Sequence, residues 1–325
     1  MQATQMELRA QGEFPTVKTA VLPEPGPGQA VVRVEATGVS FAEQQMRRGK
    51  YYDQPKFPFV PGYDLVGKVG DRRVAALTKV GGWASSVVLD EADLVDVPEG
   101  VSAEAAETVV VNGLTAYRML FRVAKVKRGE TIVVYGANGG VGSVLVQLAL
   151  HEGIRVIGTA GPGGQEGLRA LGVEPVDHRN ENVLARVRAL APGGVAAVFD
   201  HVGGPGIDDS WKMGGTLVSY GTLATRDVPG NPALPVLKLI AKLQVWNLLP
   251  NGRTAKFFNL WAGHRFRRDR FRRQLREDLT KVFELLRDGA ITPQIAARYP
   301  LEEAAEALRF AEAGGFTGKV LLLAG

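Results

Sequence analysis

Residues 131–142 read TIVVYGANGGVG. The first part is rich in β-branched residues, as is typical of a buried strand, and a glycine-dense turn follows it. The apolar run from Val141 to Leu150 is long enough for a helix. A strand, a glycine turn and a helix in this order form the phosphate-binding element of dinucleotide folds. The segment predicts such an element; the alternative is a glycine turn that only connects a strand to a helix.

The glycines of this turn have separate expected tasks. Gly136 permits the sharp turn, Gly139 lets the backbone approach a pyrophosphate without a Cβ in the way, and Gly142 lets the helix pack close to the strand. The first amide groups of the helix have no acceptor within it and carry the positive end of its dipole, so they suit an anion. The residues expected to bind the cofactor here are Gly136, Asn138, Gly139, Gly140, Val141 and Gly142.

Strands and helices alternate through the middle of the chain, from about Val109 to Gly221. Strands are expected at 132–135, 156–159, 197–199 and 217–220, and helices at 141–151, 165–171 and 181–190. This alternation predicts an α/β fold with a doubly wound parallel sheet of the Rossmann type. Beyond Gly221 the alternation ends. A proline-rich loop at 229–235 precedes an apolar, helix-compatible segment at 236–249 and an aromatic one at 256–261.

The flanking parts have a different pattern. Strands are expected at 17–22, 30–36, 65–69, 73–77 and 83–89, with one short helix at 42–48. The end of the chain predicts helices at 271–287 and 301–313 and a closing strand at 319–323. We expect this end to rejoin the N-terminal part. That gives a β-rich catalytic domain of residues 1–112 and 275–325, a dinucleotide-binding domain of residues 113–274, and an active site in the cleft between them.

Composition limits the possible functions. The 325 residues suffice for about two domains. The first eleven residues lack the apolar core of a signal peptide, and no run approaches the roughly 18 apolar residues of a membrane span, so a cytoplasmic protein is expected. The chain has no cysteine, which excludes disulfides, thiolate metal sites and a cysteine nucleophile. Its four histidines show no metal-binding spacing, and we expect no metal site.

Positive charge is concentrated in one place. Seven arginines and one acid, Asp269, lie between His264 and Arg276, although the net charge of the chain is only +5. One interpretation is the solvated start of an amphipathic helix. The other is a docking surface for an anionic partner, such as a phospholipid, a phosphorylated acyl carrier or RNA. No RNA-binding motif accompanies the run, so nucleic-acid binding is not expected.

Several short motifs together resemble one known family. The chain is similar over nearly its whole length to the zinc-free, zeta-crystallin-like quinone oxidoreductases of the medium-chain dehydrogenase/reductase superfamily. The motifs are ATGVS at 36–40, RGKY at 48–51, PGYDLVG at 61–67, GLTAY at 113–117, GGVG at 139–142 with QLA at 147–149, and GKV at 318–320. The resemblance implies that the β-rich domain is GroES-like. It also implies that the protein reduces a quinone or a C=C bond conjugated to a carbonyl, as an enone reductase does.

The chain also departs from this family. The zinc-dependent branch has a histidine-glutamate pair after the glycine at 62, where this chain has Tyr63 and Asp64. Without that pair and without cysteine, the chain lacks the residues that hold a catalytic zinc ion, so we do not expect Lewis-acid catalysis by zinc. Ser40 and Glu43 replace a more usual asparagine and aspartate. The connections after Val69 and around residue 213 are shorter than is usual, which a fold tolerates in turns.

The sequence favours NADPH over NADH. A site that prefers NAD places an acid about 20 residues past the glycine turn, at the end of the second strand. This chain has Thr159 there and no carboxylate until Glu166, so nothing repels a 2′-phosphate, and the Thr159 hydroxyl can donate to it. His178 and Arg179 stand where the family commonly places a tyrosine near that phosphate, and arginine-phosphate hydrogen bonds are strong. The alternative is that Arg179 lies on a solvated loop.

Other residues are expected around the cofactor and substrate. Val202, Tyr220 and Gly221 follow strand ends, where open α/β sheets bind ligands. His201 in the same place is expected to be structural. Asn112 and Thr115, on the loop that enters the nucleotide domain, are expected to line the nicotinamide or phosphate end, with helix capping as the alternative.

For catalysis we expect a hydrogen-bond donor beside the substrate carbonyl, because hydride addition places negative charge on that oxygen. Tyr51 matches the tyrosine that is held to deliver the proton in related enoyl-thioester reductases; the alternative is a packing aromatic. Ser40 is a second candidate donor. The apolar residues at 236–261 suit a hydrophobic substrate, but they equally suit a homodimer interface or plain core.

Three functions follow from these residues. The first is an NADPH-dependent oxidoreductase that reduces a quinone or an enone without zinc. The second is an enoyl-thioester reductase, which takes an acyl carrier or coenzyme A substrate that the arginine run helps to dock. The third is a non-catalytic, NADPH-binding adaptor at a membrane or on RNA.

Overall fold

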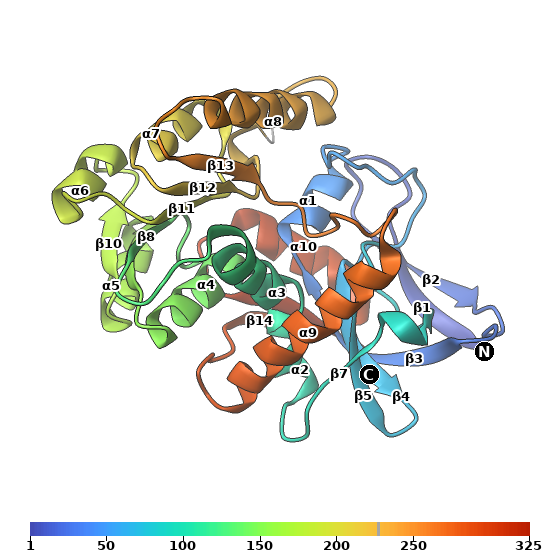
Figure 1. Cartoon of the computed structure of the whole chain (residues 1–325). Coiled ribbons are helices and arrows are strands. Elements are labelled where there is room, and N and C mark those ends of the chain that lie inside the picture. The colour runs from blue at the N-terminus through green and yellow to red at the C-terminus, as the bar shows by residue number, and fades with distance from the viewer. Residues whose placement is uncertain (226–227) are drawn as a thin grey trace. The chain divides into compact units, whose positions relative to one another are not determined.

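The computed structural model describes residues 1–225 and 228–325. The chain divides into two compact units (Figure 1). The first unit consists of Met1–Leu114 and Ala262–Gly325, and the second consists of Thr115–Trp261. The predicted boundary at 274/275 falls inside α9 (Arg268–Arg287), which belongs entirely to the first unit. The division therefore lies ahead of this helix, because its apolar face packs on other elements of the first unit.

The second unit is a doubly wound α/β fold, as the alternation of strands and helices predicted. Its sheet has the order β10-β9-β8-β11-β12-β13, and all neighbouring strands are parallel. The strands are β8 (Thr131–Val134), β9 (Arg155–Ala160), β10 (Glu174–Asp177), β11 (Ala197–Asp200), β12 (Thr216–Ser219) and β13 (Thr254–Phe257). The helices are α4 (Gly140–His151), α5 (Gln165–Ala170), α6 (Val183–Leu190), α7 (Ile207–Lys212) and α8 (Ala233–Asn247).

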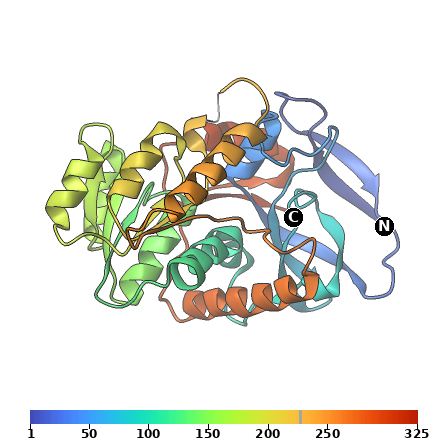
Figure 2. The same cartoon turned by 45° about the horizontal axis from the view of Figure 1, so that its top comes forward.

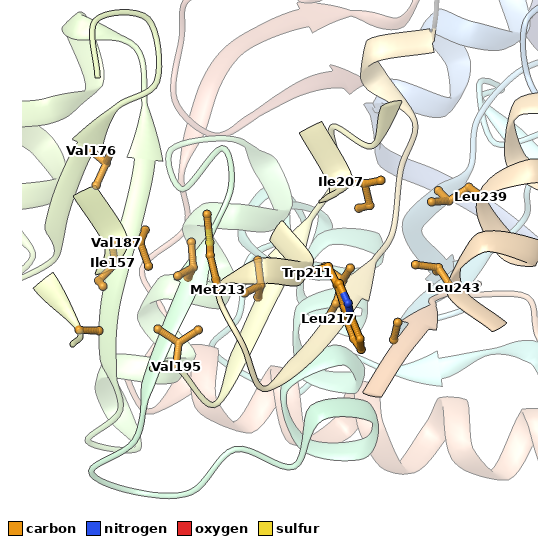
Figure 3. Packing of buried hydrophobic residues seen from close by; sticks show 14 residues of the cluster. Ile157, Val176, Val187, Val195, Ile207, Trp211, Met213, Leu217, Leu239 and Leu243 are labelled. Atoms are coloured by element: carbon orange, nitrogen blue, oxygen red, sulfur yellow. The ribbon is translucent and has the colours of Figure 1, made fainter. Parts of the chain in front are cut away.

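One apolar cluster joins this sheet to α6, α7 and α8 (Figure 3). Leu217 of β12, Trp211 of α7 and Leu243 of α8 lie together in it, and Trp211 stacks on Trp246 with ring centroids 5.1 Å apart. Leu243 is therefore core, whereas Leu248 at the end of α8 is 82% exposed. Part of the predicted apolar substrate wall or interface is thus ordinary packing that holds α8 on the sheet.

The first unit is built around a seven-stranded sheet. Its main path is β14-β15-β3-β4-β5-β7, β6 pairs with β3, and a separate hairpin joins β1 and β2. The strands are β1 (Gln2–Glu7), β2 (Thr16–Val21), β3 (Gln29–Val39), β4 (Asp64–Val69), β5 (Arg72–Leu77), β6 (Ser86–Asp90), β7 (Val95–Asp96), β14 (Ile295–Pro300) and β15 (Lys319–Leu323). The closing strand β15 pairs antiparallel with β3, with Val320 opposite Val39, so the end of the chain does rejoin the N-terminal part.

Five helices accompany these strands. They are α1 (Phe41–Arg47), α2 (Ala103–Val109), α3 (Val111–Tyr117), α9 and α10 (Ala304–Ala313). The boundary between the units falls within α3. The longest, α9, is the orange-red helix seen from the side in Figure 2. Short 3₁₀ turns cover Glu91–Asp93, Pro162–Gly164, Gly204–Gly206, Leu223–Thr225 and Leu301–Glu303, and a π-helical segment covers Arg118–Ala124.

Several elements differ from the sequence-based expectation. Only one short helix was expected between residues 16 and 110, but α2 is a second, which begins after the Ser102 cap. The strands β1, β13 and β14 and the helix α7 were not expected. Among the described helices, none has the length and apolar character needed to cross a membrane.

Candidate functional site

The glycine turn connects β8 to α4 in the second unit. Gly136 has φ +61°, a conformation that side chains with a Cβ rarely adopt. A Cβ on Gly142 would lie 2.1 Å from the Gly136 carbonyl oxygen, so only glycine permits the first turn of α4 to approach the preceding turn of the chain this closely. Gly136 thus makes the sharp turn as predicted, whereas Gly142 permits close packing against the turn and not against β8, and the role of both in binding a cofactor stays a prediction.

Thr159 holds this turn from the neighbouring strand. Its hydroxyl accepts a hydrogen bond from the Gly136 amide at 3.1 Å, and its carbonyl accepts from Ala137 at 2.9 Å. The side chain is 1% exposed. The hydroxyl thus helps to fix the glycine turn, and its donation to a 2′-phosphate stays a prediction.

Arg179 lies over the end of β9. Its backbone is fixed by Asp177, whose carboxylate accepts from the Arg179 amide at 3.0 Å. Its guanidinium reaches back to the loop after β9, where a Cβ on Gly161 would lie 3.5 Å from Nε. His178 and Arg179 are both exposed, and Asn138 of the glycine turn lies near Gly164 of the same loop. A cationic group thus stands at the strand end where a dinucleotide fold places the adenosine ribose.

His201 follows β11 and packs against the glycine turn. A Cβ on Gly136 would lie 2.5 Å from its Cε1, and its ring centroid lies 5.8 Å from that of Tyr220. Burial lowers the pKa of His201, although the Asp200 charge opposes this, so the imidazole is neutral at pH 7. Among the described atoms its Nδ1 has no hydrogen-bond partner.

Asp200 organises the loops at this sheet edge. Its carboxylate accepts from the amides of Val202 at 2.7 Å and Gly203 at 2.9 Å, and from the Ser210 hydroxyl at 2.6 Å. Gly221 packs closely against the loop that follows β11. A Cβ on Gly221 would lie 2.6 Å from the His201 carbonyl oxygen. Val202, Tyr220 and Gly221 are thus brought together at the carboxyl edge, as expected from their positions after the strands.

A large open hollow elsewhere in this unit is not the candidate site. Its volume is about 690 Å³, and Thr131, Ala196 and Gly215 line it. These residues stand at the amino ends of β8, β11 and β12, opposite the glycine turn. Ligands of open α/β sheets bind at the carboxyl ends, so the glycine turn marks the better candidate.

The candidate catalytic residues lie in the first unit. Tyr51 is 8% exposed, and its hydroxyl lies 2.9 Å from that of Tyr63, which is 7% exposed. The two rings meet edge to face, with centroids 6.4 Å apart. Burial raises the pKa of Tyr51 far above its ordinary value, and the neighbouring Tyr63 adds to this, so Tyr51 is a protonated donor at pH 7.

Ser40 and Glu43 are linked by hydrogen bonds to the backbone of Tyr63. Ser40 caps α1 by accepting from the Ala42 amide at 3.2 Å, and its own amide donates to Glu43 at 2.9 Å. The other Glu43 oxygen accepts from the Tyr63 amide at 2.7 Å. Burial raises the pKa of the fully buried Glu43 carboxyl, against the hydrogen bond from Ser40. Ser40 therefore has a capping task that was not expected, and its role as a substrate donor stays a prediction.

A buried charge cluster lies next to these residues. Lys319 of β15 donates to Asp64 at 2.6 Å and lies 2.8 Å from Glu107 of α2. A Cβ on Gly38 would lie 2.1 Å from Lys319 Cε, so glycine is needed where the lysine crosses β3. Three of the motifs that carried the family resemblance, at 36–40, 61–67 and 318–320, therefore meet in one place. The sequence did not indicate this cluster.

Asn112 and Thr115 lie in α3 and not in a loop. Their side chains are 6% and 7% exposed. The helix places them one turn apart, and Val111 beside them donates its amide to Asp64 at 3.0 Å. Their role near a cofactor stays a prediction.

The arginine run falls into two parts. Arg268 and Arg272 donate to Asp90 and Asp93 at 2.6–2.9 Å, so they attach α9 to the loop before β7. The other five are exposed: Arg265, Arg267, Arg270, Arg273 and Arg276. Neither of the two interpretations made from the sequence included these ion pairs within the first unit. Among the described residues, no group of three His, Asp or Glu side chains is placed to hold a metal ion.

Comparisons with known proteins agree with this architecture. The alcohol dehydrogenase GroES-like domain model matches residues 26–79, and the zinc-binding dehydrogenase model matches residues 171–322. The mouse synaptic vesicle membrane protein VAT-1 homolog is 31% identical over 95% of this chain and 79% of that protein. A mycocerosic acid synthase-like polyketide synthase of Mycobacterium tuberculosis is 30% identical over 98% of this chain and 15% of its own length. The quinone oxidoreductase of Thermus thermophilus, solved also with NADPH, is 30% identical, with a TM-score of 0.81 over 98% of this chain and 99% of that one.

Proposed function

The chain belongs to the zeta-crystallin-like family of medium-chain dehydrogenases/reductases, and on this premise we propose that it reduces a quinone or an enone with NADPH, without zinc. The family consists of oxidoreductases. The observation that carries the proposal is the glycine turn with Arg179 placed at the next strand end. The NADPH complex of the Thermus protein supports the same choice of cofactor.

The residues present fit a phosphorylated dinucleotide. The glycines at 136 and 142 leave the turn without side chains, and the amides at the start of α4 offer donors to a pyrophosphate. Arg179 offers a guanidinium to a 2′-phosphate, and the loop after β9 carries no acid before Glu166. NADPH, when bound, supplies the hydride.

The protein supplies the proton and stabilises the charge. Reduction of an enone adds a hydride to the β-carbon and places negative charge on the carbonyl oxygen, and Tyr51 is the protonated donor proposed to meet it. The Tyr51 proton passes to the reduced substrate, and water returns a proton to the phenolate afterwards. Reduction of a quinone takes up a proton in the same way.

Zinc is not part of the proposed reaction, because the residues do not suit it. The chain has no cysteine. The position after Gly62 holds a tyrosine whose hydroxyl contacts Tyr51, and the following Asp64 is already bound by Lys319. Neither residue is free to act as a ligand.

The test is a kinetic and binding comparison on the purified protein. Calorimetry is expected to show saturable binding of NADPH in preference to NADH, and NADPH absorbance is expected to fall with quinones or simple enones. Dialysis against a chelator is expected to leave the rate unchanged. Failure to bind either nicotinamide cofactor would overturn the proposal, and binding without turnover would favour the non-catalytic adaptor.

A second candidate is an enoyl-thioester reductase. The five exposed arginines between residues 265 and 276 and the similarity to a polyketide synthase favour it. An acidic acyl carrier would dock on that surface. Neutralising Arg270 and Arg273 together is expected to raise KM for a carrier-bound enoyl thioester while leaving that for a small enone unchanged. Equal effects on both substrates would remove the docking role.

A further inference from the structure

The helix α8 is apolar on two sides. Its inner side packs on the sheet of the second unit, where Leu239 and Leu243 belong to the apolar cluster (Figure 3). Its outer side also carries large apolar side chains, and these are between 52% and 82% exposed: Leu234, Leu237, Val245 and Leu248. Single exposed apolar residues are common on protein surfaces, but a continuous row of them marks a contact surface.

These four residues form one row together with Ala241, which is also exposed. We call the five the outer stripe. Successive members are three, four, four and three residues apart, which keeps their side chains on one face of the helix. The order of these spacings is the same in both directions from Ala241. The outer stripe is therefore symmetric along the helix axis, and its smallest side chain stands at the centre.

A symmetric stripe matches a second copy of itself. A two-fold axis that passes beside Ala241 would pair two α8 helices antiparallel, with the same residues on both sides of the contact. Leu234 then lies opposite Leu248 of the partner subunit. Leu237 lies opposite Val245 of the partner subunit, and the two Ala241 side chains meet at the axis. The small central side chain lets the two helices approach closely, and the larger ones pack at both ends.

The inner side of α8 holds the outer stripe in a fixed position. Lys242 donates to Asp208 of α7 at 2.6 Å. Near the end of the helix, the Asn247 amide group donates to the Ala255 carbonyl of β13 at 2.8 Å and accepts from the Ala255 amide at 2.7 Å. Because these bonds and the apolar cluster already order the helix, pairing through its outer side would cost little additional conformational entropy.

The charges on α8 favour a second copy of the chain over an anionic lipid surface. The helix contains two charged residues, Lys238 and Lys242, and Asp208 compensates the charge of the second. A helix that lies in a membrane interface has a polar face rich in lysine and arginine. The side of α8 opposite the outer stripe is instead packed on the sheet. No charged residue lies within the stripe, so two copies would not repel each other there.

The size of the outer stripe sets the expected strength of the contact. Each exposed leucine or valine offers on the order of 100 Å² of apolar surface, so two stripes would cover about 1,000 Å² in total. This area lies near the lower limit of specific protein interfaces, where complexes are weak and reversible.

We propose that two copies of this chain form a reversible homodimer in which their α8 helices pack antiparallel through the outer stripe, with the two-fold axis at Ala241. The expected Kd for the dimer is micromolar. The proposal concerns the second unit alone and does not depend on the proposed activity, so failure to reduce a quinone or an enone leaves it standing.

The first experiment measures the oligomeric state by sedimentation equilibrium at protein concentrations from about 1 to 200 µM. Wild type is expected to change from monomer to dimer within this range. Ala241→Glu places two carboxylates together at the axis and should raise the Kd of the dimer at least about 100-fold. Ala185→Glu, at an exposed alanine of α6, makes the same change of charge and should dimerise like wild type. Circular dichroism should show all three folded alike, because both alanines are exposed.

The second experiment tests the orientation of the helices by disulfide cross-linking. The chain has no cysteine of its own, so only introduced thiols can react. Ala241→Cys is expected to give a cross-linked dimer under mild oxidation. Leu234→Cys alone should not, because the two introduced thiols would lie about 21 Å apart along the helices, too far for a disulfide. A mixture of Leu234→Cys and Leu248→Cys should cross-link to each other.

Several results would overturn the proposal. Wild type that stays monomeric at the highest concentration would do so, as would a dimer that Ala241→Glu leaves intact, since that dimer uses another surface. Efficient cross-linking of Leu234→Cys with itself would show that the helices are not antiparallel. Binding of a monomeric wild type to phosphatidylserine vesicles, lost in Ala241→Glu, would assign the outer stripe to a lipid surface instead.

Discussion

Lys319 Nζ lies 2.6 Å from Oδ2 of Asp64, in a site from which water is almost excluded. Glu107 brings a second carboxyl to the same nitrogen, at 2.8 Å. One ammonium cannot compensate two buried carboxylates. Burial and the Asp64 charge raise the pKa of Glu107 well above its ordinary value, in spite of Lys319. We infer that Glu107 is the carboxyl that keeps a proton.

This assignment predicts unequal effects of two similar substitutions. Glu107→Gln replaces a neutral carboxyl by a neutral amide, so at pH 4, where this carboxyl is mostly protonated in the folded and the unfolded chain, the free energy of unfolding should change by less than about 1 kcal/mol. Asp64→Asn removes the partner of a buried ammonium and should cost about 3–5 kcal/mol. Urea unfolding measures both. Equal losses would show that both carboxyls are ionised.

The same cluster predicts a pH dependence. The pKa of Glu107 is higher in the folded protein than its ordinary value of 4.5, so the folded state binds the proton more tightly. Wild type should therefore lose stability relative to Glu107→Gln as the pH rises above 4.5. A stability difference that is constant from pH 4 to 8 would contradict the raised pKa.

His201 should act in the opposite direction. Its pKa is lowered by burial from an ordinary value of 6.5, so folding favours the neutral imidazole. The associated stability is complete above pH 6.5 and is lost as the pH falls. His201→Gln should therefore reduce the fall in unfolding free energy between pH 7.5 and 5.5 by about 1 kcal/mol. His151→Gln, at an exposed helix end, is the control and should keep the wild-type slope.

The glycine turn can be tested by adding one methyl group. Gly142→Ala would place a Cβ 2.1 Å from the Gly136 carbonyl oxygen, so α4 must move away from the turn. We expect a loss of at least about tenfold in NADPH affinity and about 1–3 kcal/mol in stability. Gly193→Ala has open space around it and should change neither. Calorimetry with NADPH and urea unfolding distinguish these results.

Arg179 should determine the choice between the two cofactors. Arg179→Ala removes the guanidinium beside Gly161 and should raise the Kd for NADPH about tenfold, while that for NADH stays the same. Arg186→Ala, on the exposed side of α6, is the matched loss of one positive charge. If both variants weaken NADPH equally, the effect is general attraction and not a phosphate contact.

The two parts of the arginine run should also behave differently. Arg272 contacts Asp90 and Asp93 and is only 19% exposed, so Arg272→Ala should lower the unfolding free energy by about 1 kcal/mol. Arg270→Ala should have almost no effect, because that side chain is exposed on α9. A large loss in Arg270→Ala would mean that the exposed arginines also stabilise the fold.

Local patterns predicted the second unit well, because strands and helices each have a characteristic spacing of apolar residues and turns have characteristic residue types. The glycines at 136 and 142 could be assigned tasks since a turn and a close approach demand glycine. The edge strand β13 was missed, because Thr254–Phe257 is short and follows α8 without an intervening pattern of its own. The helix α2 was missed although Ser102 marks its start.

The contacts that matter most in the first unit are not local. Tyr63 and Tyr51 are close in sequence, but only the folded loops show that their hydroxyls meet. Asp64, Glu107 and Lys319 come together through the pairing of β3 with β4 and β15. No pattern within a short stretch of sequence indicates that distant residues will be in contact. The sequence therefore indicated the motifs but not the contacts between them.

The late position of Lys319 has a consequence for how the molecule is made on the ribosome. Residues 115–261 leave the exit tunnel as a complete unit while the strand that carries this lysine is still unsynthesised. Until it arrives, Asp64 and Glu107 lack their counter-ion and β3 lacks a neighbour. The second unit can therefore mature first, whereas the first unit must wait for β15 to be translated.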